Sequence, residues 1–286
     1  MNKETPSKSP TLAESIAEGL NMHGYLLQQA VRREIQKYEA DQRRTWGVDA
    51  SEFPVTAADG TETRIDLVIQ WEPLSYINLS VECKRAYQKP WVFWGMENPA
   101  KRVPIKRFYI EQVTPIAGTA YDHMICSLPS PRAAYNFYLE MNPPPREKSE
   151  KASNADSIEK AFSQCIRGQS GLFTHATERM KLTRYCVLPV VLTTAKLYSL
   201  NLSSDDISLH NGYVDHAKVV PVEEKFVTVN YHASNSLKAL GAPKPSDLTH
   251  SISQAMLRSI FVANVEHLPE FLDFLADNVV HHIART

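Results

Sequence analysis

The chain has 286 residues, of which 43% are hydrophobic and 22% are charged, and its formal net charge at pH 7 is −1. This composition is typical of a soluble globular protein, so disorder is not the default expectation, and the length suffices for one large α/β core or two small domains. The net charge gives no general attraction for nucleic acid, so any such contact requires a local basic patch. The sequence has no apolar run of transmembrane length, and its polar N-terminus lacks a signal-peptide core. We therefore expect a cytoplasmic protein with no membrane contact.

The spacing of the cysteines and the absence of several short motifs limit the kinds of site that the sequence predicts. The cysteines stand at positions 83, 126, 165 and 186, without zinc-finger or C-x-x-C spacing, which favours buried thiols in a reducing compartment. The sequence contains no G-x-S-x-G elbow, no G-x-x-x-x-G-K-[ST] phosphate loop and no H-E-x-x-H motif. The corresponding hydrolase, nucleotide-binding and zinc sites are not expected.

The N-terminal part predicts a tail, a helix and a first hairpin. Residues 1–10 have the composition of a disordered tail. Residues 11–40 predict a helix, because apolar residues recur at spacings of three, four or seven. That stripe consists of Ile16, Leu20, Leu27, Val31, Ile35 and Tyr38. Residues 52–56 predict a strand, and Asp59-Gly60 is a hairpin-turn signal.

Residues 64–86 predict two amphipathic strands joined by a turn. In each run apolar and polar residues alternate, so each strand has one apolar face and one mostly polar face. Matching the apolar faces of an antiparallel pair requires the numbers of opposed residues to have an even sum. A register that sets Trp71 near Ile77 meets this condition. It also sets Asp66 opposite Glu82, with their Cβ atoms about 5 Å apart.

On the polar face, two carboxylates and a lysine come together. Asp66 and Glu82 repel each other at this distance unless a divalent cation neutralises them, and Lys84 projects from the same side as Glu82. Asp, Glu and Lys on adjoining strands resemble the D…E-x-K signature of the PD-(D/E)XK, or restriction-endonuclease-like, nuclease superfamily. The match consists of Asp66, Glu82 and Lys84, with Ile65 in place of the proline of the signature.

The resemblance implies a fold and a metal site. The fold would be a restriction-endonuclease-like α/β core, a mixed central β-sheet flanked by helices, in a single domain over residues 11–286 with an insertion after the E-x-K strand. Asp66, Glu82 and the carbonyl of Cys83 would bind Mg²⁺ or Mn²⁺. Lys84 would orient a water or stabilise the transition state.

The helix before the strands offers a further acidic residue. In many superfamily members such a residue completes the metal site, and Glu34 is the best placed candidate in this sequence. Glu34 adjoins the apolar stripe of the predicted helix. The alternative, in which Glu34 pairs with Arg33 or Lys37 on a solvated face, explains its position equally well.

A second helix is expected after the insertion. Residues 142–156 have the composition of a linker, and Asp156 with Glu159 forms a capping-box-like start. The apolar stripe of this helix contains Ile158, Phe162 and Cys165, and its opposite face carries Lys160, Gln164 and Arg167. Because the resemblance implies that the polar face of this helix looks onto the active site, Gln164 is a candidate for positioning substrate or water.

The insertion, about residues 87–156, is expected to carry substrate or partner specificity. Its first part is basic and interleaved with aromatic residues, so cations could bind phosphates while rings stack on bases. Equally, the aromatic residues could belong to the core and the lysines to a solvated surface. The candidate DNA-contacting residues are Lys89, Lys101, Arg102, Lys106, Arg107 and, from the later helix, Arg167.

The rest of the chain predicts strands followed by helix. Residues 185–200 are β-rich and predict two strands, or one strand interrupted at Pro189. Residues 219–231 predict two more strands, and the segment at about 251–283 has helical spacing of its apolar residues.

The resemblance implies hydrolysis of DNA phosphodiester bonds by an endonuclease, with restriction or anti-phage defence as a setting. DNA would be a partner, beside a second copy of the chain or a defence-system protein. One alternative is a catalytically silent nuclease-like fold that binds DNA or a partner. Another is an unrelated α/β protein in which the two strands are not neighbours. A second E-x-K tripeptide, Glu223 to Lys225, lies between two apolar runs and is interpreted as a solvated hairpin tip or edge.

Overall fold

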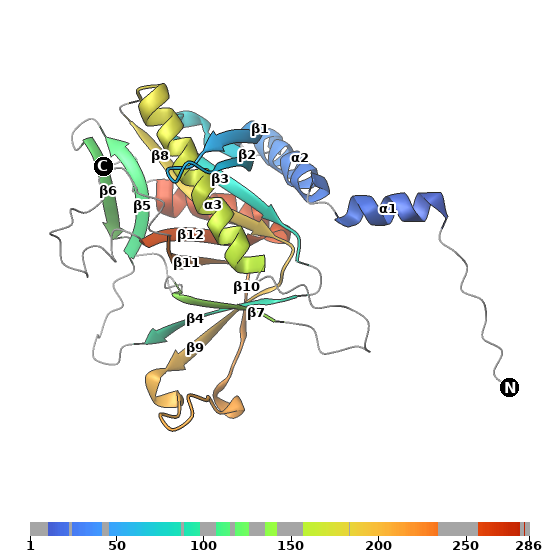
Figure 1. Cartoon of the computed structure of the whole chain (residues 1–286), viewed down its shortest axis with the longest axis vertical. Coiled ribbons are helices and arrows are strands. Elements are labelled where there is room, and N and C mark those ends of the chain that lie inside the picture. The colour runs from blue at the N-terminus through green and yellow to red at the C-terminus, as the bar shows by residue number, and fades with distance from the viewer. Residues whose placement is uncertain are drawn as a thin grey trace.

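The computed structural model describes residues 11–22, 25–41, 46–86, 89–97, 107–114, 118–125, 135–141, 157–182, 184–233, 257–280 and 283. The predicted tail and the predicted linker at 142–156 lie outside these residues. The protein is a mixed α/β structure (Figure 1). Among the described residues, no helix combines the length and the apolar character needed to cross a membrane.

The helices are α1 Leu12–Met22, α2 Tyr25–Asp41, α3 Ser157–Thr174 and α5 Leu268–Phe274, and π-helical turns follow α3 at His175–Arg179 and α5 at Leu275–Val280. The strands are β1 Trp46–Thr56, β2 Glu62–Trp71, β3 Ile77–Lys84, β4 Trp91–Glu97, β5 Arg107–Thr114, β6 Gly118–Ile125, β7 Phe137–Glu140, β8 Tyr185–Thr193, β9 Leu197–Ser203, β10 Val222–Glu224, β11 Phe226–His232 and β12 Leu257–Asn264.

The main sheet is mixed, and its strands follow the order β1-β2-β3-β8-β12-β11. β1, β2 and β3 form an antiparallel meander, β3 and β12 both run parallel to β8, and the β5–β6 hairpin joins at one end of β8. Parallel pairing of β3 with β8 requires a crossover connection, and α3 lies within it. A smaller sheet has the order β10-β9-β4-β7.

The predicted register of β2 and β3 is confirmed. Leu67 lies opposite Val81 and Gln70 opposite Asn78, which is the register that sets Trp71 near Ile77. This pairing excludes the interpretation in which the two strands are not neighbours. The predicted turn also forms, because Gly60 adopts a positive φ of 81° and donates its N–H to the carbonyl of Ala57.

The mostly polar face of β3 is buried as well as its apolar face. β3 is a central strand, and seven of its eight residues are buried. α2 and α5 cover one face of the sheet, packing around Val31 and Phe271, while α3 crosses the other face (Figure 1). Glu82 and Lys84 therefore project into the layer between β3 and α3.

α3 packs very closely on the sheet because it carries glycine at the contact. A Cβ at Gly171 would lie 2.7 Å from Cβ of Val55, and a Cβ at Gly168 would lie 3.0 Å from Cγ1 of Ile65. Ile65 thus packs toward α3 with Leu172, whereas Leu67 belongs to the cluster on the opposite face. The predicted alternation of β2 consequently breaks at Asp66.

Pro189 lies within β8, in the middle of the sheet, and does not interrupt the strand as one of the two predictions allowed. Proline has no N–H to donate to the neighbouring strands. Side chains of α3 supply donors beside it: the Cys165 thiol lies 3.4 Å from the carbonyl oxygen of Val190, and Nε2 of Gln169 donates to the carbonyl of Val187 at 2.9 Å. Cys83, Cys165 and Cys186 are buried free thiols, as predicted.

The predicted helix over residues 11–40 is two helices. In α2 the stripe through Val31, Ile35 and Tyr38 is buried, as predicted. α1 extends away from the body of the protein (Figure 1), and its apolar residues Ile16 and Leu20 are exposed. α1 ends at Met22 and α2 begins at Tyr25.

The prediction of helix over the whole of 251–283 was wrong. Residues 257–264 form β12, all of whose residues are buried between β8 and β11. A strand with both faces buried contains a continuous apolar run, here residues 260–263, which periodicity alone does not distinguish from a segment of buried helix. The helical part begins at Leu268, after Asn264 caps a short turn by accepting the N–H of Glu266.

The smaller sheet holds Trp91, Phe93 and Trp94 from the insertion. Trp91 and Phe93 are fully buried, so the interpretation that places them in the core is correct and they are not available to DNA. Trp94 is half-buried and stacks on Phe137, with ring centroids 5.6 Å apart. Residues 185–200 give two strands, as one of the two predictions had it, and the break falls after Thr193.

Candidate active site

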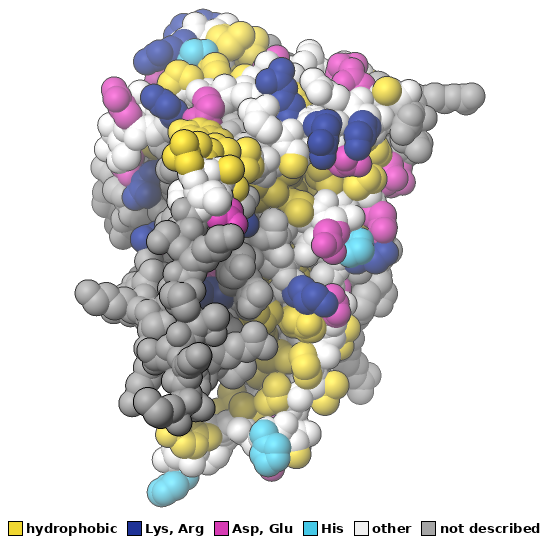
Figure 2. All heavy atoms as spheres, turned by 90° about the vertical axis from the view of Figure 1, so that its right-hand side faces the viewer, with side chains coloured by type: hydrophobic (Ala, Val, Ile, Leu, Met, Phe, Trp, Pro, Cys, Tyr) yellow, Lys and Arg dark blue, Asp and Glu magenta, His cyan; other side chains and the backbone are white. Residues whose placement is uncertain are grey.

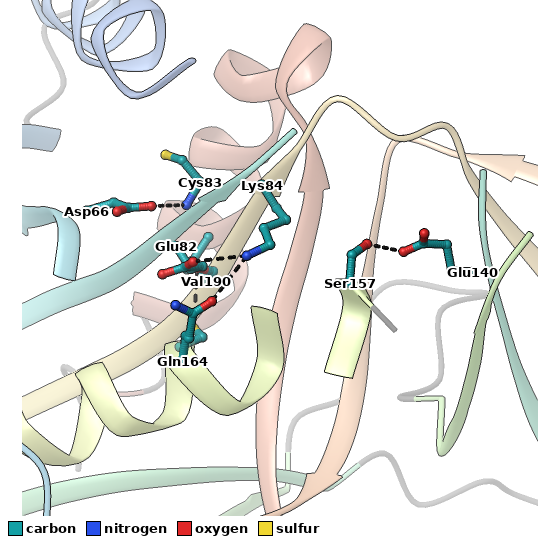
Figure 3. A network of polar contacts seen from close by, with 9 residues as sticks. Asp66, Glu82, Cys83, Lys84, Glu140, Ser157, Gln164 and Val190 are labelled. Carbon is teal, nitrogen blue, oxygen red and sulfur yellow. Dashed lines mark hydrogen bonds and ion pairs between the residues drawn. The ribbon is translucent and has the colours of Figure 1, made fainter. Parts of the chain in front are cut away.

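The site forms where β2 and β3 part. Their ladder ends at Leu67 and Val81, one residue before Asp66 and Glu82. Asp66 closes the gap, because its Oδ2 accepts the main-chain N–H of Cys83 at 2.7 Å (Figure 3). Burial raises the pKa of Asp66, the hydrogen bond from Cys83 opposes that shift, and the charge of Glu52 adds to it.

Glu82 is the most strongly perturbed acid of the site. It is only 8% exposed, and burial together with the nearby charge of Asp66 raises its pKa to about 8, although Lys84 acts in the opposite direction. At neutral pH Glu82 is therefore largely protonated while no cation neutralises it. Burial and the surrounding carboxylates also raise the pKa of the Cys83 thiol, which excludes a thiolate at this position near neutral pH.

Lys84 connects β3 to α3 through its side chain. Its Nζ lies 3.7 Å from Oε1 of Glu82 and donates to Oε1 of Gln164 at 3.1 Å (Figure 3). The Lys84 side chain is 25% exposed, so the ammonium group is held in place and still reaches solvent. Asp66, Glu82, Lys84 and Gln164 are thus brought together as the sequence predicted.

Glu34 is not in this group of contacting side chains. It lies on α2 and forms an ion pair with Lys37, with Nζ and Oε2 3.1 Å apart. This is the alternative placement given for Glu34 in the sequence analysis. The carbonyl of Cys83 remains a predicted ligand, since the contact found at this residue is the one from its N–H to Asp66.

The sequence analysis missed Glu52, whose charge acts on both Asp66 and Glu82. Glu52 lies on β1 in the left-handed region, with φ of 50°, which is strained for a residue other than glycine. Its charge contributes to the raised pKa values of Asp66 and Glu82. Glu52 also forms an ion pair with Arg64, with Oε2 and Nη1 4.0 Å apart. No sequence signal marks Glu52, because the predicted strand gives no indication of a positive φ.

A second missed residue is Gln28 of α2, which donates from Nε2 to the main-chain carbonyl of Asp66. It is 2% exposed and lies on the buried stripe that the sequence analysis assigned to the adjacent Leu27. A polar residue beside an apolar one at helical spacing gives no signal by itself.

The predicted DNA-contacting residues fall into two groups. Lys89 and Arg167 are engaged within the protein: Lys89 pairs with Glu140 at 3.1 Å, and Arg167 pairs with Asp59 at 3.4 Å. Lys101, Arg102 and Lys106 lie outside the described residues, as does the side chain of Arg107 at the start of β5. Figure 2 shows that, on the face drawn, the described Lys and Arg side chains are interspersed with Asp and Glu rather than gathered in one basic surface.

The described side chains of the site provide carboxylates for a metal ion but do not form a complete set of ligands around one. In the described part of the chain, no group of three or more His, Cys, Asp or Glu side chains is arranged to hold a metal ion. Asp66 and Glu82 provide two carboxylates whose mutual repulsion a cation would relieve. Mg²⁺ is often bound in proteins by one or two carboxylates, with water and substrate oxygens filling its other positions. The residues therefore fit this ion.

No protein-family model matches the sequence, and comparison with curated proteins and with solved structures gives no significant match.

Proposed function

We propose that the protein is a metal-dependent endonuclease that hydrolyses DNA phosphodiester bonds at the site of Asp66, Glu82 and Lys84. The observation that carries the proposal is the meeting of two carboxylates and a lysine where β2 and β3 part. Glu82 in particular resists ionisation, with a pKa of about 8, because Asp66 and the protein interior both oppose a second charge. Such an arrangement is costly as structure alone and useful when a cation is held there.

Asp66 and Glu82 would hold Mg²⁺ or Mn²⁺, with the carbonyl of Cys83 as a proposed further ligand. A divalent cation supplies positive charge beside the scissile phosphate and lowers the pKa of water that serves as the nucleophile. The N–H of Cys83 fixes the carboxylate of Asp66 in orientation. Glu82 must release a proton to become a ligand, so its raised pKa makes cation affinity depend on pH.

Lys84 would stabilise charge that develops on the phosphate. Its ammonium is held between Glu82 and Gln164, which limits its motion without removing it from solvent. A preorganised cation of this kind needs little reorganisation when the reaction occurs. Gln164 would position Lys84 rather than act on the substrate itself.

The order of elements adds support for a restriction-endonuclease-like core. α2, β1, β2 and β3 come in this order, α3 and β8 follow after the intervening strands β4 to β7, and helices flank both faces of the mixed sheet. Three parts of the proposal rest on the resemblance of Asp66, Glu82 and Lys84 to the superfamily signature. They are DNA as the substrate, endonucleolytic cleavage, and a setting in restriction or defence. A second copy of the chain or a defence-system protein is the partner that this setting implies.

The test is incubation of the protein with supercoiled plasmid and Mg²⁺ or Mn²⁺, beside two double variants. In Glu82→Ala/Lys84→Ala the proposed site is removed. In Glu223→Ala/Lys225→Ala the second E-x-K tripeptide is removed, where both residues form exposed surface ion pairs. We expect cleavage by the parent and by the second variant, and none by the first.

Cleavage by all three proteins would contradict the assignment of the site. If none cleaves, retention of a labelled duplex by the parent in EDTA would favour the catalytically silent binding module instead.

A further inference from the structure

Gln28 is a polar residue at an apolar position. In α2 it precedes Val31 by three residues and Ile35 by seven, so it belongs to the same buried stripe, and it is 2% exposed. A buried amide is normally hydrogen-bonded, because its desolvation otherwise costs free energy. Its Nε2 donates to the main-chain carbonyl of Asp66.

Among the described residues, Asp66 is skipped in the pairing of β2 with both of its neighbouring strands. Toward β3 the ladder stops at Leu67 and Val81. Toward β1 the described pairs skip Asp66 and Glu52, the residue with positive φ. Buried main-chain polar groups need partners. At this point side chains take the place of the ladder: Gln28 satisfies the carbonyl of Asp66, and the carboxylate of Asp66 satisfies the N–H of the facing strand.

We infer that Gln28 is a positioning residue that fixes the main chain of Asp66, and through it the direction of the Asp66 carboxylate. The two hydrogen bonds act in series, from the α2 amide to the Asp66 carbonyl and from the Asp66 carboxylate to Cys83. Without the first, the main chain of Asp66 loses its anchor to α2, and we expect the second to weaken. The consequence for metal binding and cleavage rests on the proposed function, whereas the consequence for the Cys83 amide does not.

Gln28→Met tests this inference, because methionine is unbranched, helix-compatible and close in size, and it removes the amide that donates to Asp66. Ile35→Val is the matched control, since it trims the same buried stripe two turns later without touching Asp66. Asp66→Ala serves as the reference for complete loss of the bond to Cys83.

The first readout is hydrogen exchange of the Cys83 amide in the metal-free protein, measured relative to the ladder amides of residues 77–81. We expect relative exchange about tenfold faster or more in Gln28→Met, and similarly faster in Asp66→Ala. We expect no relative change in Ile35→Val. The second readout is calorimetric titration with Mg²⁺, in which Gln28→Met should bind about 10 to 100-fold more weakly than the parent.

The two readouts separate the two hypotheses. If the parent binds neither Mg²⁺ nor Mn²⁺, the proposed function fails, and the Cys83 amide still decides the role of Gln28. Suppose that the relative exchange rate of the Cys83 amide is the same in Gln28→Met as in the parent, and that Asp66→Ala increases it. Gln28 then does not position the carboxylate of Asp66. A merely structural role would lower the stability of Gln28→Met and Ile35→Val alike and leave the relative exchange of Cys83 unchanged.

Discussion

The carboxylate of Asp66 accepts the main-chain N–H of Cys83 at 2.7 Å, so an ionisable side chain completes the hydrogen bonding between β2 and β3. Asp66→Ala therefore has two opposed effects on stability. It leaves a buried N–H without its acceptor, which costs about 1–3 kcal/mol. It also removes repulsion with Glu82, but only where Glu82 is ionised.

Because the pKa of Glu82 is about 8, that repulsion is absent at pH 6 and present at pH 9. We expect metal-free Asp66→Ala to lose about 1–3 kcal/mol of unfolding free energy at pH 6 and less at pH 9. Urea denaturation at the two pH values measures this difference. A larger loss at pH 9 than at pH 6 would contradict the coupling of the two carboxylates.

Glu82 itself should make the metal-free protein less stable as the pH rises. Its pKa is about 8 in the folded state and near its ordinary value of 4.5 in the unfolded state. Between these values the folded state holds a proton that the unfolded state has released, so raising the pH favours unfolding. The stabilisation is complete below about pH 4.5, and it is lost as the pH rises toward 8, by a few kcal/mol in all.

Denaturation of the parent and of Glu82→Gln from pH 5 to pH 8.5 checks this dependence. The variant should lack the component of the decline that belongs to Glu82. Added Mg²⁺ should reduce the decline in the parent and have little effect in Glu82→Gln. Parallel stability curves for the two proteins would show that Glu82 ionises normally.

Lys84→Met should reduce cleavage by about 100-fold or more, since it removes a cation placed to stabilise charge in the transition state. Methionine retains most of the aliphatic stem, so the unfolding midpoint should change little. Lys225→Met is the control, because Lys225 belongs to the second E-x-K tripeptide and pairs with Glu270 at the surface. Equal activity of the two variants would remove Lys84 from the mechanism.

Gln164→Leu should lower cleavage about tenfold by freeing the ammonium of Lys84, whose Nζ it holds at 3.1 Å. Lys160→Ala, one turn earlier on an exposed position of the same helix, should have no effect. The combination of Gln164→Leu with Lys84→Met should be no worse than Lys84→Met alone, because Gln164 acts through Lys84. A further loss in the double variant would assign Gln164 a separate role.

The two strands and their register could be predicted from sequence because side-chain period and turn geometry both constrain them. Leu67 lies opposite Val81 because any shift by one residue would turn the apolar side of a strand to the wrong face. The convergence of Asp66, Glu82 and Lys84 follows from that register. The apolar stripe of α3 placed Gln164 on the opposite, polar face, and the resemblance to the superfamily made that face a candidate for the site.

The remaining features depend on contacts that local pattern does not encode. The burial of Glu82 arises from α3, which is separated from β3 by more than 70 residues. The break of alternation at Asp66 and the positive φ of Glu52 are local departures from regular strand geometry, for which the sequence offers no glycine as a signal. β12 was mistaken for helix because a strand buried on both faces shows no alternation.

The close approach of α3 to the sheet yields a further prediction, at Gly171. A Cβ at this position would lie 2.7 Å from Cβ of Val55 and 3.2 Å from the carbonyl oxygen of Thr56, so α3 or β1 must move. We expect Gly171→Ala to cost about 1–3 kcal/mol of unfolding free energy despite the better helix propensity of alanine. Gly19→Ala in α1, where a Cβ meets nothing within 4 Å, should not destabilise the protein.

The same displacement should reach the site, since α3 carries Gln164 two turns before Gly171. Cleavage measured well below the unfolding midpoint should therefore fall in Gly171→Ala and not in Gly19→Ala. If Gly171→Ala loses stability while keeping full activity, the helix shifts without disturbing the contact between Gln164 and Lys84. If it loses neither, the packing distance between α3 and β1 is larger than the structure gives.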